Sequence, residues 1–156
     1  EWQHDESLEW DVLQYPFHGG LQRWMGDLNR CYRAEPALYQ KDFVGEGFSW
    51  VDFHDWEESV ISFMRHGQRP EDSVLIVCNF TPVARQNYVV GVPRGGYWKE
   101  ILNSDAGIYG GSGVGNMGGV EASPVAVQGH YHSLSLTLPP LGVVYLRPAT
   151  GNGSTS

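Results

Sequence analysis

The chain has 156 residues, of which 41% are hydrophobic and 18% are charged, a composition that suits one folded core and argues against disorder. Its formal net charge of -8 argues against a nucleic-acid partner, because phosphate binding needs a basic surface. Neutral ligands such as sugars remain compatible with this charge.

No apolar stretch approaches the roughly 20 residues that a membrane-spanning helix needs. The first residues lack the basic and apolar regions of a signal peptide, and residue 1 is Glu rather than Met, so we expect a fragment or a processed chain. The two cysteines, Cys31 and Cys78, are predicted to be buried free thiols. These features favour a cytoplasmic protein.

Residues 1–17 show no clean periodicity and are predicted to form an irregular loop. The next segment, from His18 to Ala34, is predicted to be a helix, because its apolar residues recur at the spacing of one helical face. Gly19 and Gly20 lie at its start, and Pro36 ends it, since a residue before proline avoids the helical region. The apolar residues of this face are Leu21, Trp24, Met25, Leu28, Cys31 and Tyr32.

After the helix the periodicity changes to two, and short apolar runs alternate with Gly/Pro turns. The predicted strands are 48–53, 60–64, 74–80, 88–92, 97–102, 133–138 and 142–146. Such spacing is typical of an antiparallel β-sandwich, so the expected fold is mainly β, preceded by one α-helix. Residues 149–156 are predicted to be a disordered tail.

Local motifs point to no cofactor and no metal. Residues 113–118 fit the pattern G-x-G-x-x-G, but they lie among other glycines in a β-region without a following helix, so a glycine-rich loop is the better interpretation. His130 and His132 lack a third ligand at metal-site spacing. Asn79-Phe80-Thr81 fits a glycosylation sequon, which a cytoplasmic protein would not use. No catalytic constellation emerges.

The aromatic residues are the remaining candidates for a binding site. Most are expected to be core, but Trp50 stands where the helical part gives way to the sheet. A flat ring there suits the apolar face of a glucose unit, with Asp52 as a partner for its hydroxyls. Trp98 and Tyr109 are weaker candidates of the same kind.

Several sequence blocks also carry a family resemblance. They are 1–10, 20–23, 27–38, 42–43, 47–50, Asn79-Phe80-Thr81-Pro82-Val83, 98–105, 109–113 and 132–141. In order and spacing they closely resemble the end of the catalytic barrel and the C-terminal β-domain of bacterial 1,4-α-glucan (glycogen) branching enzymes, of the α-amylase superfamily. The resemblance covers residues 1–148.

The resemblance implies that residues 1–40 are the loop and last helix of a (β/α)₈ barrel and that 41–148 are the C-terminal all-β domain. Such enzymes cleave an α-1,4-glucan and transfer the piece to form an α-1,6 branch, using an Asp nucleophile, a Glu acid/base and a second Asp. All three would lie upstream of Glu1, so we expect no catalytic residue in this chain and no activity from it alone.

The resemblance also names partners. They are the upstream barrel and an α-glucan, such as glycogen, amylose or malto-oligosaccharides. The leader would lie near the top of the barrel, which brings Trp2 and Trp10 near the substrate cleft. The open alternatives are a stand-alone carbohydrate-binding module, a purely structural β-domain, and the C-terminal domain of a related amylase or debranching enzyme.

Overall fold

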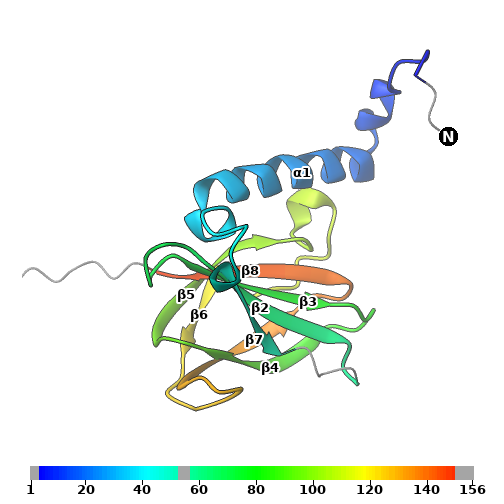
Figure 1. The fold of residues 1–156 in the computed structure, drawn as a ribbon. Coiled ribbons are helices and arrows are strands. Elements are labelled where there is room, and N and C mark those ends of the chain that lie inside the picture. Colours follow the sequence, from blue (N-terminus) through cyan, green and yellow to red (C-terminus); the bar gives the residue numbers. More distant parts are fainter. Residues whose placement is uncertain (1–3, 53–56, 150–156) are drawn as a thin grey trace, which may run out of the picture.

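In a computed structural model of the protein, residues 4–52 and 57–149 are described. Short 3-10 helices flank one long helix at the start of the chain, and eight strands follow (Figure 1). The helical elements are η1 (Trp10–Gln14), α1 (Pro16–Ala34), η2 (Pro36–Leu38), η3 (Gly45–Gly47) and η4 (Gly107–Tyr109). The strands are β1 (Phe48–Asp52), β2 (Val60–His66), β3 (Ser73–Asn79), β4 (Arg85–Val92), β5 (Gly96–Asn103), β6 (Gly119–Ala122), β7 (His132–Leu138) and β8 (Gly142–Pro148).

Helix α1 confirms the expected helix and begins two residues earlier, at Pro16. Proline suits the first turn of a helix, because its missing N–H would have no partner there. The helix ends at Ala34, two residues before Pro36, as predicted. The leader is more regular than expected, since its residues Trp10–Gln14 form η1.

The strands form two antiparallel sheets. One has six strands in the order β1-β2-β3-β8-β5-β6, and the other pairs β4 with β7. All seven strands expected from the periodicity are confirmed. The sequence analysis missed β6, which follows the glycine-rich loop and pairs with Gly96–Lys99 of β5.

The two sheets pack face to face around the main hydrophobic core. This core joins residues of the six-stranded sheet, including Met64, Leu75 and Trp98, to Val90 and Leu136 of the β4–β7 sheet. We call this side of the six-stranded sheet its inner face. The predicted β-sandwich is therefore confirmed.

The outer face of the six-stranded sheet carries a second apolar cluster, covered by the helices. Ala37 and Leu38 of η2 pack there on Val74 and Ile76 of β3, and Cys31 of α1 packs against the same cluster. Figure 1 shows α1 along this outer side, with β4 and β7 on the far side of the molecule. The molecule thus has three layers: α1, the six-stranded sheet and the two-stranded sheet.

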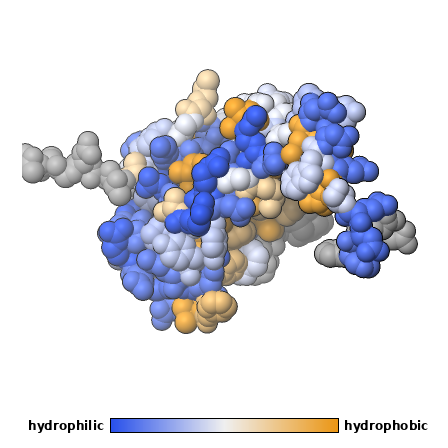
Figure 2. Space-filling model, turned by 90° about the horizontal axis from the view of Figure 1, so that it is seen from above, coloured by the Kyte–Doolittle hydropathy of each residue, from blue (hydrophilic) through white to orange (hydrophobic). Residues whose placement is uncertain are grey.

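Helix α1 also leaves part of its apolar surface exposed. We call it the α1 stripe. Its four members, which are exposed, are Phe17, Leu21, Met25 and Tyr32. Figure 2, which looks down on this side of the molecule, shows hydrophobic side chains among the polar ones. Within the described ranges, no helix combines the length and the apolar character that crossing a membrane requires.

Candidate functional site

Trp50 lies in β1, at the edge of the six-stranded sheet, and about half of its surface is exposed. Its ring meets Phe48 edge-on, with centroids 4.9 Å apart, and Phe63 of β2 at 5.9 Å. Phe48 and Phe63 are themselves stacked at 5.3 Å. We call these three residues the β1 aromatic cluster. Because its neighbours hold the Trp50 ring, the cluster offers a firm, partly exposed apolar surface on the outer face.

Asp52 is two residues further along the same strand, but it does not lie beside Trp50. The pairing of β1 with β2 shifts between these two residues, so that Trp50 is opposite Phe63 and Asp52 is opposite the buried Ser62. Asp52 accepts a 2.8 Å hydrogen bond from Gln128, whose own side-chain oxygen accepts from the Gly91 N–H of β4. The strand irregularity thus turns Asp52 toward the β4–β7 side and separates the two residues that the sequence analysis paired.

Trp98 was a weaker candidate for a sugar contact, and that prediction is wrong. Its side chain has no exposed surface and forms part of the main core between the sheets. The indole N–H donates to the carbonyl oxygen of Arg94 at 3.2 Å, so the ring's polar atom is also used internally. A ring without exposed surface cannot stack on a ligand.

Tyr109, the other weaker candidate, joins the loop after β5 to α1. Its hydroxyl donates a 2.7 Å hydrogen bond to Asp27, and its ring packs edge-on against Trp24 at 5.2 Å. Burial, together with the hydrogen bond to Asp27, raises the pKa of Tyr109 to about 12. The same hydrogen bond is the largest cause that lowers the pKa of Asp27. Tyr109 is only half-buried, and it borders a cleft between α1 and β5.

The leader contains two further candidates for glucan contact, Trp2 and Trp10. Trp10 lies in η1, and its side chain is exposed. Trp2 lies outside the described residues, as do residues 150–156 of the expected tail.

The glycine-rich segment is a loop with many hydrogen bonds. Asp105 accepts from the hydroxyl and the N–H of Ser112 and from the N–H of Val114. The segment leads into β6 rather than into a helix, so it lacks the strand–helix setting that the dinucleotide pattern requires. Within residues 4–52 and 57–149, no three His, Cys, Asp or Glu side chains gather as metal ligands.

Sequence reasoning missed Phe63 as a neighbour of Trp50. The alternation of β1 places Phe48 on the same face as Trp50, so that contact could have been inferred. The contact with Phe63 depends on the register between β1 and β2, which no local pattern gives.

Comparison with known proteins identifies what the chain resembles. Residues 50–149 match the family described as "Alpha amylase, C-terminal all-beta domain". The 1,4-alpha-glucan branching enzyme GlgB of Aquifex aeolicus is 58% identical over 147 residues, which are 94% of this chain and 23% of that protein. The corresponding enzyme of Aromatoleum aromaticum is 58% identical over 148 residues, 95% of this chain and 23% of the relative. That of Cereibacter sphaeroides is 54% identical over 151 residues, 96% of this chain and 20% of the relative. The chain thus spans less than a quarter of the length of these relatives.

Proposed function

Because this chain belongs to the alpha amylase C-terminal all-beta domain family and matches the C-terminal segment of 1,4-alpha-glucan branching enzymes, we propose that it serves such an enzyme as a non-catalytic part. The complete enzyme cleaves α-1,4-glucan and rejoins the piece through an α-1,6 link, in the cytoplasmic synthesis of glycogen. This segment supports the barrel and contacts glucan. The catalytic Asp, Glu and Asp come from the upstream barrel.

The observation that carries this proposal is that α1 uses only part of its apolar surface to cover the β-domain. Trp24 and Cys31 pack toward the β-domain, whereas the four residues of the α1 stripe remain largely exposed. Of these, Phe17 borders the loop at Gly110 and Tyr32 donates a hydrogen bond to Asp42, but neither contact covers the ring. An apolar stripe of this kind is typical of a surface that packs against another layer. We assign the upstream barrel as that layer, with residues 1–40 as its end and residues 41–148 as the C-terminal domain.

The proposed glucan contact is the β1 aromatic cluster, centred on Trp50. Half-exposed indole rings held by neighbouring aromatic rings suit the apolar face of a glucose unit. Trp10, in the leader, is a second exposed ring that this proposal assigns to glucan. Asp52 can assist only from the other side of β1, so we do not assign it a direct hydroxyl contact with the sugar at Trp50.

The test compares Trp50→Ala with Phe43→Ala, which removes a fully exposed aromatic ring outside the cluster. Binding of maltohexaose to this chain is measured by calorimetry, and the melting temperature is measured in parallel. Trp50→Ala should weaken binding by about five- to tenfold, since one stacked aromatic ring contributes on the order of 1–1.5 kcal/mol. Phe43→Ala should leave binding unchanged.

Two results would contradict the proposal. Unchanged affinity together with a lower melting temperature would make Trp50 a packing residue of a purely structural domain. Loss of the iodine colour of amylose in the presence of the purified 156-residue chain would show that the chain itself catalyses branching.

A further inference from the structure

A groove runs along the junction between the C-terminal half of α1 and the β-domain. It consists of two hollows, of about 380 Å³ and about 250 Å³. Both are lined by Ala34 and Glu35, so the two hollows are neighbours. Asp27 lines only the first hollow and Glu35 lines both, and the helical rise separates these two residues by about 12 Å. No residue of the β1 aromatic cluster lines either hollow.

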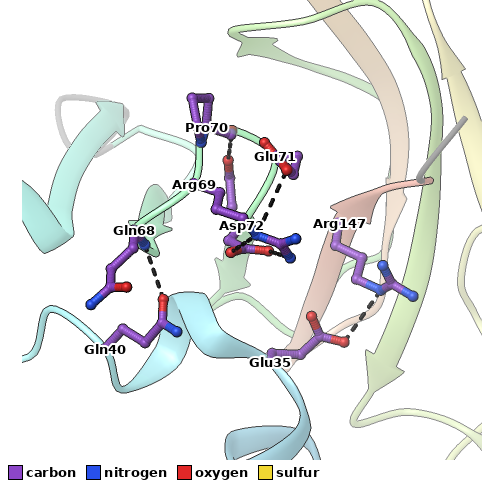
Figure 3. Close-up of polar contacts among 9 residues, drawn as sticks. Glu35, Gln40, Gln68, Arg69, Pro70, Glu71, Asp72 and Arg147 are labelled. Atoms are coloured by element: carbon purple, nitrogen blue, oxygen red, sulfur yellow. Dashed lines mark hydrogen bonds and ion pairs between the residues drawn. The ribbon is translucent and has the colours of Figure 1, made fainter.

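One end of the groove is built from paired charges on three separate segments (Figure 3). Arg69, in the turn between β2 and β3, holds Asp72 with two 2.8 Å hydrogen bonds. Arg147 of β8 points to Glu35, which directly follows α1, with Nε 3.2 Å from a carboxylate oxygen. Burial raises the pKa of Glu35, and the Arg147 charge opposes that rise. Each ion pair fixes the direction in which its partners present their remaining hydrogen-bonding atoms.

Arg147 and Glu35 are held together by charge rather than by a hydrogen bond from Nε. The Arg147 Nε is buried, and the Glu35 oxygen beside it is not in hydrogen-bonding direction. Among the described residues, nothing else accepts a hydrogen bond from this atom.

The other end of the groove combines an apolar floor with polar sides. Ile101 and Leu102 of β5 form the floor, and Tyr109 and Arg30 stand beside it. Asp27 lies between these two polar side chains, accepting hydrogen bonds from both. Apolar floors with a few fixed polar groups at the sides are typical of small-molecule sites.

The charges of the groove favour a neutral ligand. Its lining has three arginines, Arg30, Arg69 and Arg147, against four carboxylates: Asp27, Glu35, Glu71 and Asp72. The excess of one carboxylate disfavours anions. Each of the four carboxylates lies in an ion pair with one of the arginines, which disfavours a cation. A polyol, in contrast, can donate to carboxylates and accept from guanidinium groups along the whole length.

We propose that this groove is a second binding site of the chain, which takes a short α-glucan separately from Trp50. The inference rests on the proposed function, because that function supplies the class of ligand.

The experiment titrates the full chain with maltohexaose in a Trp50→Ala background, so that the β1 aromatic cluster is already removed. Onto this background we place Arg69→Ala, the near-isosteric Glu35→Gln, and, as a matched control, Arg33→Ala, an exposed arginine of α1 that does not line the groove. Amide chemical shifts of Ala34, Asp72 and Arg147 are followed during the titration. Melting temperatures identify any variant that fails to fold, and Glu35→Gln is the variant least able to disturb packing.

We expect Trp50→Ala to retain part of the maltohexaose binding, with chemical-shift changes at the amides of Ala34, Asp72 and Arg147. Arg69→Ala and Glu35→Gln should each weaken that residual binding at least about fivefold, as expected for a lost hydrogen bond to a charged group, and Arg33→Ala should not. If Trp50→Ala alone abolishes all binding, the groove proposal is wrong and the proposed function stands. Residual binding that is unchanged in both Arg69→Ala and Glu35→Gln would also overturn the groove proposal. Absence of binding to the unmodified chain would overturn both glucan sites together.

Discussion

Gly20 of α1 lies directly against the backbone of Tyr109, in η4 of the loop after β5. A Cβ added to Gly20 would stand 2.2 Å from the Tyr109 carbonyl oxygen and 2.7 Å from its carbonyl carbon. Since backbone atoms cannot rotate away, any side chain at position 20 must push the helix off the loop. The close approach therefore fixes how near α1 sits to the β-domain.

Gly20→Ala should consequently destabilise the protein by about 1–3 kcal/mol, the usual cost of overpacking, in spite of the better helix propensity of alanine. Urea unfolding at constant temperature measures the change. Gly26→Ala is the matched control, because the nearest atom to a Cβ there is an Arg30 side-chain nitrogen at 3.6 Å, an ordinary contact. That control should gain up to about 1 kcal/mol. Equal losses in both variants would show that α1 does not depend on the approach at Gly20.

Asn79 connects three segments through its buried side-chain amide. The amide nitrogen donates to the carbonyl oxygens of Val83 and Pro139, and the amide oxygen accepts from the N–H and hydroxyl of Thr81. Asn79→Asp keeps the shape but replaces the donor by an acceptor that faces two carbonyl oxygens. We expect a loss of at least about 2 kcal/mol in the free energy of unfolding, against no significant change in the exposed control Asn29→Asp. An unchanged midpoint for Asn79→Asp would contradict this role.

Asp105 makes the glycine-rich loop sensitive to acid. Burial alone would raise the pKa of this carboxyl, but the hydrogen bonds from Ser112 and Val114 outweigh it, and the pKa is lowered. A lowered pKa in the folded state means that the carboxylate stabilises the fold fully above its unfolded-state pKa of about 3.9 and less as the pH falls through the folded-state value. Unfolding free energies of the unmodified chain and of Asp105→Asn should therefore differ by a constant amount between about pH 5 and pH 7, and the difference should shrink as the pH falls below about 4. A difference that grows on acidification would contradict the assignment.

Trp98 and Trp50 should behave in opposite ways when each is changed. Trp98→Phe leaves a void in the fully buried core and should cost about 2 kcal/mol of stability, while the folded protein binds maltohexaose as before. Melting temperature and calorimetric affinity, measured on the same samples, separate the two effects. Weaker binding by folded Trp98→Phe would show that Trp98 contributes to glucan binding.

The fold was predictable from the sequence where local periodicity determines structure. The stripe of α1 and the alternation in 133–138 gave a helix and a strand that the structure confirms. Periodicity did not reveal which apolar residues of α1 are covered by the β-domain. Trp24 and Cys31, which pack toward it, have the same helical spacing as Leu21 and Met25, which are exposed. Strand β6 was missed because its pairing with β5 is a long-range contact and it begins at a glycine.

The candidate site was less predictable, because it depends on pairing between strands. Trp50 was chosen because it stands where the helical part gives way to the sheet, and its role in glucan contact remains a proposal. The irregular pairing that turns Asp52 away has no local signal. Trp98 and Trp50 look alike in the sequence, each within a strand, and only the sheet order distinguishes an enclosed strand from an edge.

The sheet order also bears on how the protein is made. Strand β8 is the last strand of the chain, yet it lies between β3 and β5 and hydrogen-bonds to both. While a ribosome is still adding residues before Gly142, β3 and β5 have no common partner, and the apolar side chains of their inner faces lack Val144 and Leu146. The apolar inner faces of β3 and β5 must therefore stay accessible to chaperones until β8 leaves the ribosome and completes the sheet.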